Sequence, residues 1–129
     1  MKTIGMLGRG LLSTAVVIFA TAMMARAQEV TVNMFDTPAT FRPDPIKIKV
    51  GQTVKWVNKG DTVHTATDDP SQAPDPSFAA LPKGAQAFDS GYMNAGDTWS
   101  YTFKVPGVYK YFCLTHETEG MKGEVDVEQ

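Results

Sequence analysis

The sequence predicts an all-β protein: a Greek-key β-sandwich of about eight strands in two sheets. Apolar and polar residues alternate with a period of two along most of the chain after residue 28, which is typical of strands with one buried face. Clusters of Gly, Pro, Asn and Asp interrupt these segments at short intervals, as in a sandwich or a small barrel. Helical periodicity is scarce in the same region.

Six segments show this alternation or a β-branched and aromatic composition, and we expect strands at Glu29–Phe35, Ile46–Val50, Val54–Asn58, Thr98–Phe103, Gly107–Cys113 and Met121–Glu128. The turns between them are predicted at Pro43–Pro45, Gly51–Gln52, Asn58–Asp61, Asn94–Asp97 and Pro106–Gly107. The stretch Asp68–Ala87 differs, because it contains four prolines. We interpret it as a surface connection between the sheets with one helical turn at Ser77–Leu81, in preference to a loop that shapes a binding site.

The first 27 residues are typical of an export signal. Lys2 and Arg9 precede an uncharged, mostly apolar run, Leu11–Ala25, and Ala25-Arg26-Ala27 resembles a cleavage site. A membrane-spanning helix needs roughly 20 apolar residues, so this run is short for a retained anchor. The sequence therefore predicts a secretory signal peptide at 1–27, cleaved after Ala27, and one periplasmic domain at 28–129 without a transmembrane segment.

Charge limits the partners of this domain. Without the three basic residues of the export segment, the chain keeps 9 basic and 14 acidic side chains, a net charge of −5. No basic patch or run is present, which argues against nucleic-acid binding. We expect a monomer that meets protein partners.

The candidate functional residues are a cysteine, two histidines and a methionine. Cys113 is the only cysteine of an exported chain, so it has no partner for an internal disulfide. It begins the pattern Cys-x2-His-x4-Met with His116 and Met121, and His64 is the only other histidine. Each residue alone would usually be part of the core or the surface. Their conjunction predicts a metal site, in which three donors of one tight loop meet a fourth donor from a distant segment.

Copper fits this donor set better than zinc does. Thiolate and thioether groups suit Cu(I), and trigonal His2Cys sites with a weak axial Met transfer electrons. Cys and His also bind zinc, but zinc gains little from a methionine. A nucleophilic Cys–His pair lacks an obvious third residue to orient it. One cysteine cannot form a dinuclear copper centre, and Phe112 and Leu114 beside Cys113 do not give the His-Cys-His run of multicopper oxidases.

These residues carry a family resemblance that covers nearly the whole predicted domain. The resemblance runs through Phe41-x-Pro43, Gly51-x-Thr53-Val54-x-Trp56-x-Asn58, His64, Phe88-Asp89-Ser90-Gly91, Gly96-Asp97-Thr98-Trp99 and Pro106-Gly107-x-Tyr109-x-Tyr111-Phe112-Cys113-x-x-His116-x-x-x-x-Met121-x-Gly123. The pattern resembles that of the small cupredoxins, the type 1 blue copper proteins, and within them plastocyanin and pseudoazurin.

The resemblance implies one type 1 copper ion with His64, Cys113 and His116 as equatorial ligands and Met121 as the axial ligand. It also implies electron transfer through the exposed edge of His116 to redox partner proteins, such as a cytochrome c or an oxidoreductase, at a transient interface. Thr65 stands where many members carry Asn directly after the first His ligand. Its hydroxyl could replace the hydrogen bond that ties this segment to the cysteine loop.

Three functional hypotheses follow. The first is an electron carrier that is not an enzyme and cycles between Cu(I) and Cu(II). The alternatives are a periplasmic copper carrier or storage module, against which the scattered methionines count, and a copper accessory subunit of a redox enzyme, against which Met121 counts. Glu117 and Glu119 flank His116, and we expect their charge to lower the reduction potential.

Overall fold

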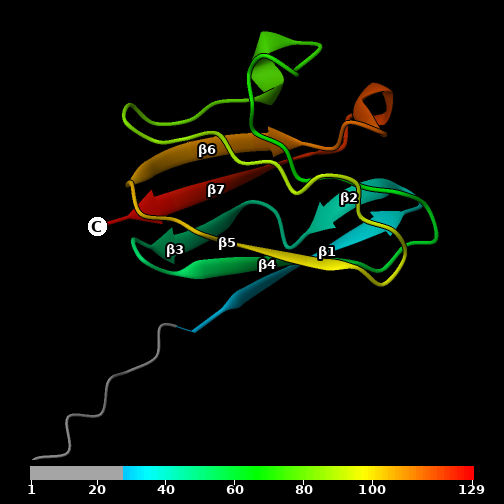
Figure 1. Ribbon diagram of the computed structural model, residues 1–129, viewed down its shortest axis with the longest axis horizontal. Coiled ribbons are helices and arrows are strands. Elements are labelled where there is room, and N and C mark those ends of the chain that lie inside the picture. Colours follow the sequence, from blue (N-terminus) through cyan, green and yellow to red (C-terminus); the bar gives the residue numbers. More distant parts are fainter. Residues whose placement is uncertain (1–27) are drawn as a thin grey trace, which may run out of the picture.

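A computed structural model of the protein describes residues 28–129, which form two β-sheets packed face to face (Figure 1). The predicted signal peptide at 1–27 and its cleavage after Ala27 lie outside the described residues. Within residues 28–129, none of the helices has the length and apolar character needed to cross a membrane.

The first sheet has four strands in the spatial order β2-β1-β4-β5. They are β1 (Val30–Asp36), β2 (Ala39–Arg42), β4 (Thr53–Asn58) and β5 (Thr98–Thr102). β1 runs parallel to β4, whereas β2 and β5 pair antiparallel with their neighbours. The first and fourth strands of the chain thus lie side by side at the centre of this sheet.

The second sheet has three strands in the order β3-β7-β6. They are β3 (Ile46–Lys49), β6 (Gly107–Phe112) and β7 (Lys122–Glu128). β3 pairs parallel with β7, and β6 pairs antiparallel with it. The chain crosses between the sheets after β2, β3 and β5, as expected for Greek-key connections. The all-β sandwich fold is therefore confirmed.

The predicted strands agree with the structure to within one or two residues at each end. Seven regular strands form in residues 28–129, one fewer than the number expected, and β2 had no predicted counterpart. The segment that contains His64 makes only isolated bridges, His64 with Met93 and Thr67 with both Asp89 and, in β6, Phe112. It runs beside β6 without becoming a strand.

Aromatic side chains fill the space between the sheets. Trp56 and Tyr111 are fully buried and meet edge to face with their ring centroids 5.5 Å apart, and Phe88 packs on both of them. Aromatic pairs of this kind contribute beyond their buried area, by about 0.5–1.5 kcal/mol each. The site loop therefore rests on a closely packed base, since Tyr111 lies only two positions before Cys113.

The proline-rich stretch Asp68–Ala87 crosses the outer side of β6 (Figure 1). The helical turn expected at Ser77–Leu81 is a single 3-10 turn, η1 (Pro76–Phe78), capped by the Asp75 carboxylate, which accepts a hydrogen bond from the Ser77 N–H. The main chains of Ala80 and Lys110 of β6 exchange two hydrogen bonds. This connection is thus fixed to the strand that leads into Cys113.

Candidate metal centre

The loop between β6 and β7 supplies three of the four predicted site residues. Cys113 directly follows β6, and Met121 directly precedes β7. Between them the chain makes one 3-10 turn, η2 (Glu117–Glu119), which ends at Gly120 in the left-handed conformation. The Cys113 N–H donates to the Met121 carbonyl at 3.0 Å, and the Met121 N–H donates to the His116 carbonyl at 3.3 Å. The two ends of the loop are thereby joined.

His64 approaches from the other side, out of the connection between β4 and β5. Its N–H and carbonyl pair with the main chain of Met93 at 3.1 and 2.9 Å, which fixes its position. The imidazole is fully buried and lies 4.5 Å from that of His116, centroid to centroid.

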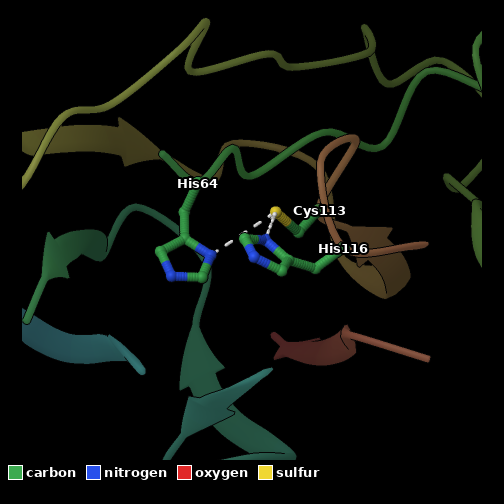
Figure 2. Close-up of side chains that lie close together, drawn as sticks. All are labelled: His64, Cys113 and His116. Atoms are coloured by element: carbon green, nitrogen blue, oxygen red, sulfur yellow. Dashed lines mark hydrogen bonds between the residues drawn. The ribbon is translucent and has the colours of Figure 1, made fainter. Parts of the chain in front are cut away.

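Two imidazole nitrogens converge on the cysteine sulfur (Figure 2). The Nδ1 atoms of His64 and His116 each lie 3.6 Å from Cys113 Sγ. One ligand atom from each of the three residues lies within 4.8 Å of the others. Cys113 and His64 are fully buried, whereas His116 is partly exposed. This set of nitrogen, nitrogen and sulfur donors fits a single soft or borderline metal ion.

Met121 lies beside the same cluster through its main chain. Its side chain is fully buried, and its main chain contacts both Cys113 and His116. The structure thus brings His64, Cys113 and His116 together, and the main chain of Met121 lies beside two of them.

Hydrogen bonds hold the cysteine sulfur in place. The Thr65 N–H donates to Cys113 Sγ at 3.3 Å, and the Thr115 hydroxyl lies 3.1 Å from the same sulfur. Thr115 also donates to the Val63 carbonyl at 2.6 Å, which ties the loop to the segment before His64. Such contacts orient ligands and tune a bound metal.

Thr65 makes the connection that its hydroxyl was expected to allow. Its Oγ1 accepts a hydrogen bond from the Leu114 N–H at 2.9 Å, and the Thr67 hydroxyl donates to it at 3.0 Å. Thr65 therefore binds both the sulfur and the main chain of the cysteine loop, through its N–H and its hydroxyl respectively.

The protonation of His64 is set by its surroundings. Burial lowers the pKa of His64, although the hydrogen bond between Nε2 and Asp36 Oδ1, at 2.7 Å, opposes this shift. A proton on Nε2 that is donated to the carboxylate leaves Nδ1 unprotonated and facing Cys113. A metal ligand has to be a neutral imidazole with a free lone pair, and His64 has this form.

Asp36, Thr62 and Thr115 were not identified from the sequence. The Thr62 hydroxyl, followed by the Asp61 N–H, lowers the pKa of Asp36 below its usual range. Asp36 directly follows the predicted strand Glu29–Phe35, and a polar residue at a strand end is usually solvated. Nothing in the spacing connects positions 36 and 64.

The family to which this chain belongs follows from comparison with known proteins. The sequence model described as "Copper binding proteins, plastocyanin/azurin family" matches residues 28–128. The chain belongs to this family of copper-binding proteins, the small cupredoxins.

Individual relatives agree with this assignment. The chain is 36% identical to plastocyanin of Scenedesmus fuscus over 92 residues, covering 68% of this chain and 86% of the relative. It is 34% identical to the chloroplastic plastocyanin of Oryza sativa subsp. indica, covering 94% and 78% of the two chains. Among solved structures, a purple cupredoxin from Nitrosopumilus maritimus superposes with a TM-score of 0.61 at 26% identity, covering 77% of this chain and 99% of that one.

The donor set of this chain fits the metal of its family, because a thiol and two imidazoles lie at one place and the buried Met121 is joined to Cys113 and His116 through its main chain. Copper is therefore the cofactor. Membership of the family supports copper-based electron transfer as the class of activity.

Proposed function

We propose that the protein is an exported, mononuclear type 1 copper protein that shuttles single electrons between redox partner proteins. In this proposal His64, Cys113 and His116 are the principal ligands and Met121 is the weak fourth ligand. The observation that carries it is the convergence of two imidazole Nδ1 atoms on one buried thiol. Copper at this site would supply a one-electron change between Cu(I) and Cu(II).

The frame around the four side chains favours a carrier. The two ends of the loop are hydrogen-bonded to each other through the main chains of Cys113 and Met121. Thr65 donates to the Cys113 sulfur and accepts from the Leu114 N–H. Residues fixed in this way keep their positions when the charge at the site changes, so electron transfer needs little rearrangement. Burial of three of the four side chains also excludes water.

The partner would meet the protein at the end where His116 is partly exposed. Leu114, also partly exposed, would lie near the centre of this interface. A shuttle has to leave its partner quickly, which suits a small interface. A cytochrome c or an oxidoreductase of the periplasm fits this role, and the net negative charge of the predicted domain favours a partner with a basic surface. We propose that the carrier acts as a monomer.

The test is the visible spectrum of residues 28–129 loaded with Cu(II). We expect an intense thiolate-to-copper band, blue or green, that disappears on reduction and returns on reoxidation. A protein that takes up zinc in a fixed ratio but stays colourless with Cu(II) would contradict the proposal. Uptake of Cu(I) alone, without a reversible oxidised form, would favour the copper carrier or storage alternative.

Two variants assign the ligands in the same experiment. Cys113→Ser replaces sulfur by oxygen at nearly constant size and is expected to abolish the band. Met121→Leu keeps the volume of the side chain but removes the thioether. We expect it to retain copper and the band while changing the band position and the reduction potential. An unchanged spectrum in Met121→Leu would remove Met121 from the ligand set.

The charges of η2 give a second prediction. Replacement of both Glu117 and Glu119 by Gln is expected to raise the reduction potential by roughly 40 mV at low salt, since two negative charges near His116 favour Cu(II). The shift should shrink at high salt because exposed charges are screened. Protein-film voltammetry measures it. Asp126→Asn with Glu128→Gln, at the far end of β7, removes the same charge away from the site and should leave the potential nearly unchanged.

A further inference from the structure

One carboxylate, that of Asp36, is surrounded by hydrogen-bond donors at the end of β1. Its Oδ2 accepts from the N–H groups of Asp61 and Thr62 at 2.6 and 3.2 Å. Its Oδ1 accepts from the Thr62 hydroxyl and from His64 Nε2, each at 2.7 Å. An ordinary surface carboxylate is solvated and mobile, whereas this one is held by three neighbouring residues from another part of the chain.

The turn after β4 is shaped around this carboxylate. Gly60 has no side chain, and a Cβ built there would overlap the carboxylate of Asp36. Asn58 fixes the turn, because its Oδ1 accepts from the Gly60 N–H at 2.9 Å and its Nδ2 donates to the Thr62 carbonyl at 2.8 Å. Asn58 is itself buried. The absence of a side chain at position 60 is what allows Asp36 to reach His64.

Asp36 is also connected to the second histidine. Thr62 Oγ1 lies 3.4 Å from His116 Nε2 and donates its own proton to Asp36. The hydroxyl can therefore only accept from the Nε2–H of His116. The ring nitrogens of both histidines that face away from Cys113 are thus linked to one carboxylate, directly for His64 and through Thr62 for His116.

We propose that Asp36 is a positioning residue that holds both imidazoles with Nδ1 toward the metal and, by its negative charge, favours the oxidised over the reduced site. This inference rests on the proposed function, since it concerns the two histidines as copper ligands. A carboxylate that accepts the outer N–H of a ligating histidine fixes the ring and raises its basicity. A fixed negative charge nearby favours the ion of higher valence.

The first test is the reduction potential of copper-loaded Asp36→Asn and Asp36→Ala. Mutation of the hydrogen-bond partner of a ligating histidine typically lowers the metal affinity by about 10–100-fold. We expect the equilibrium between the oxidised and reduced sites to move about tenfold toward the reduced one in both variants, which is about +59 mV for one electron. Glu29→Gln removes the same charge just before the other end of β1 and should leave the potential nearly unchanged. Equal shifts in Asp36→Asn and Glu29→Gln would overturn the proposal.

Gly60→Ala separates position from charge. This variant keeps the carboxylate but pushes it away from His64, so its potential should rise in the same direction as that of Asp36→Asn. In an Asp36→Ala background the carboxylate is gone, and Gly60→Ala should then have little further effect. A potential that stays at the wild-type value in Gly60→Ala, with the protein folded, would overturn the proposal.

The last test needs no copper and therefore separates this inference from the proposed function. In the metal-free protein, proton–nitrogen NMR should show a slowly exchanging proton on His64 Nε2, and Asp36→Ala should accelerate its exchange at least tenfold. Thr62→Val should accelerate exchange at His116 Nε2 in the same way and leave His64 less affected. If the exchange rates of wild type and Asp36→Ala are equal, Asp36 does not hold His64, whatever the metal experiments show.

Discussion

The metal-free protein is expected to lose about 3 kcal/mol of stability as the pH rises from about 4 to about 7, through the single side chain of Asp68. This carboxyl group is fully buried. Its Oδ1 accepts from the Phe88 N–H at 2.5 Å, whereas its Oδ2 has no hydrogen-bond partner. Burial raises the pKa of Asp68 to about 7, and the charges of Asp69 and Asp89 act in the same direction.

The sign follows from the protons bound by each state. Between pH 4 and pH 7 the folded protein keeps the proton of Asp68, while the unfolded chain has lost it. The unfolded state then binds fewer protons, so stability falls as the pH rises, and the loss is complete about one pH unit above the folded pKa. The shift from 3.8 to about 7 is roughly 3 units, at about 1.4 kcal/mol per unit.

Asp68→Asn provides the comparison, because an amide resembles the protonated carboxyl group and does not titrate. Urea unfolding of both proteins between pH 4 and pH 8 should show a decline in wild type that is largely absent in the variant. Asp69→Asn removes a neighbouring, partly exposed charge and should keep most of the decline. Parallel stability curves for wild type and Asp68→Asn would show that Asp68 is charged in the folded protein.

The candidate metal-site residues stand out in the sequence because their chemistry is rare and their spacing is local. Cys113, His116 and Met121 lie within nine residues, so any loop that joins β6 and β7 brings them near each other. His64 followed from the donor count alone, since no other histidine exists. The strands were predictable for a similar reason: each alternation of apolar and polar residues is complete within one segment.

The surroundings of the ligands were not predictable in the same way. Asp36 and His64 meet because β1 pairs in parallel with β4, so that the end of β1 lies beside the turn after β4. That register is a property of the assembled sheet. β2 was missed because only one of its four residues, Phe41, is a large apolar side chain, so no alternation can be recognised there. Thr115 looks like an ordinary loop residue until the loop is closed onto the Val63 carbonyl.

A second large effect on stability is expected at Gly123, in the strand that follows Met121. Gly123 lies opposite Tyr111 in the register of β6 and β7, and the tyrosine ring lies over it. A Cβ at this position would lie 2.5 Å from both Cζ and Oη of Tyr111. The ring is fully buried and has aromatic neighbours, Phe41 and Trp56 among them, so it cannot move aside freely. Overpacking of a core typically costs about 1–3 kcal/mol, and we expect Gly123→Ala to reach the upper end of this range.

Thermal unfolding of the metal-free protein measures this cost, because about 3 kcal/mol lowers the Tm of a domain of this size by roughly 12–24 °C. The cause can be tested by a double-mutant cycle with Tyr111→Leu, which removes the ring that the new methyl group would meet. Gly123→Ala should be much less harmful in that background than in wild type. If it costs the same in both, the loss comes from the backbone of β7 and not from the tyrosine. In that case the packing under the site loop would depend less on this glycine. Tyr111 is joined to Cys113 through Phe112 alone, so we expect Gly123→Ala to weaken copper binding only if it displaces the tyrosine ring.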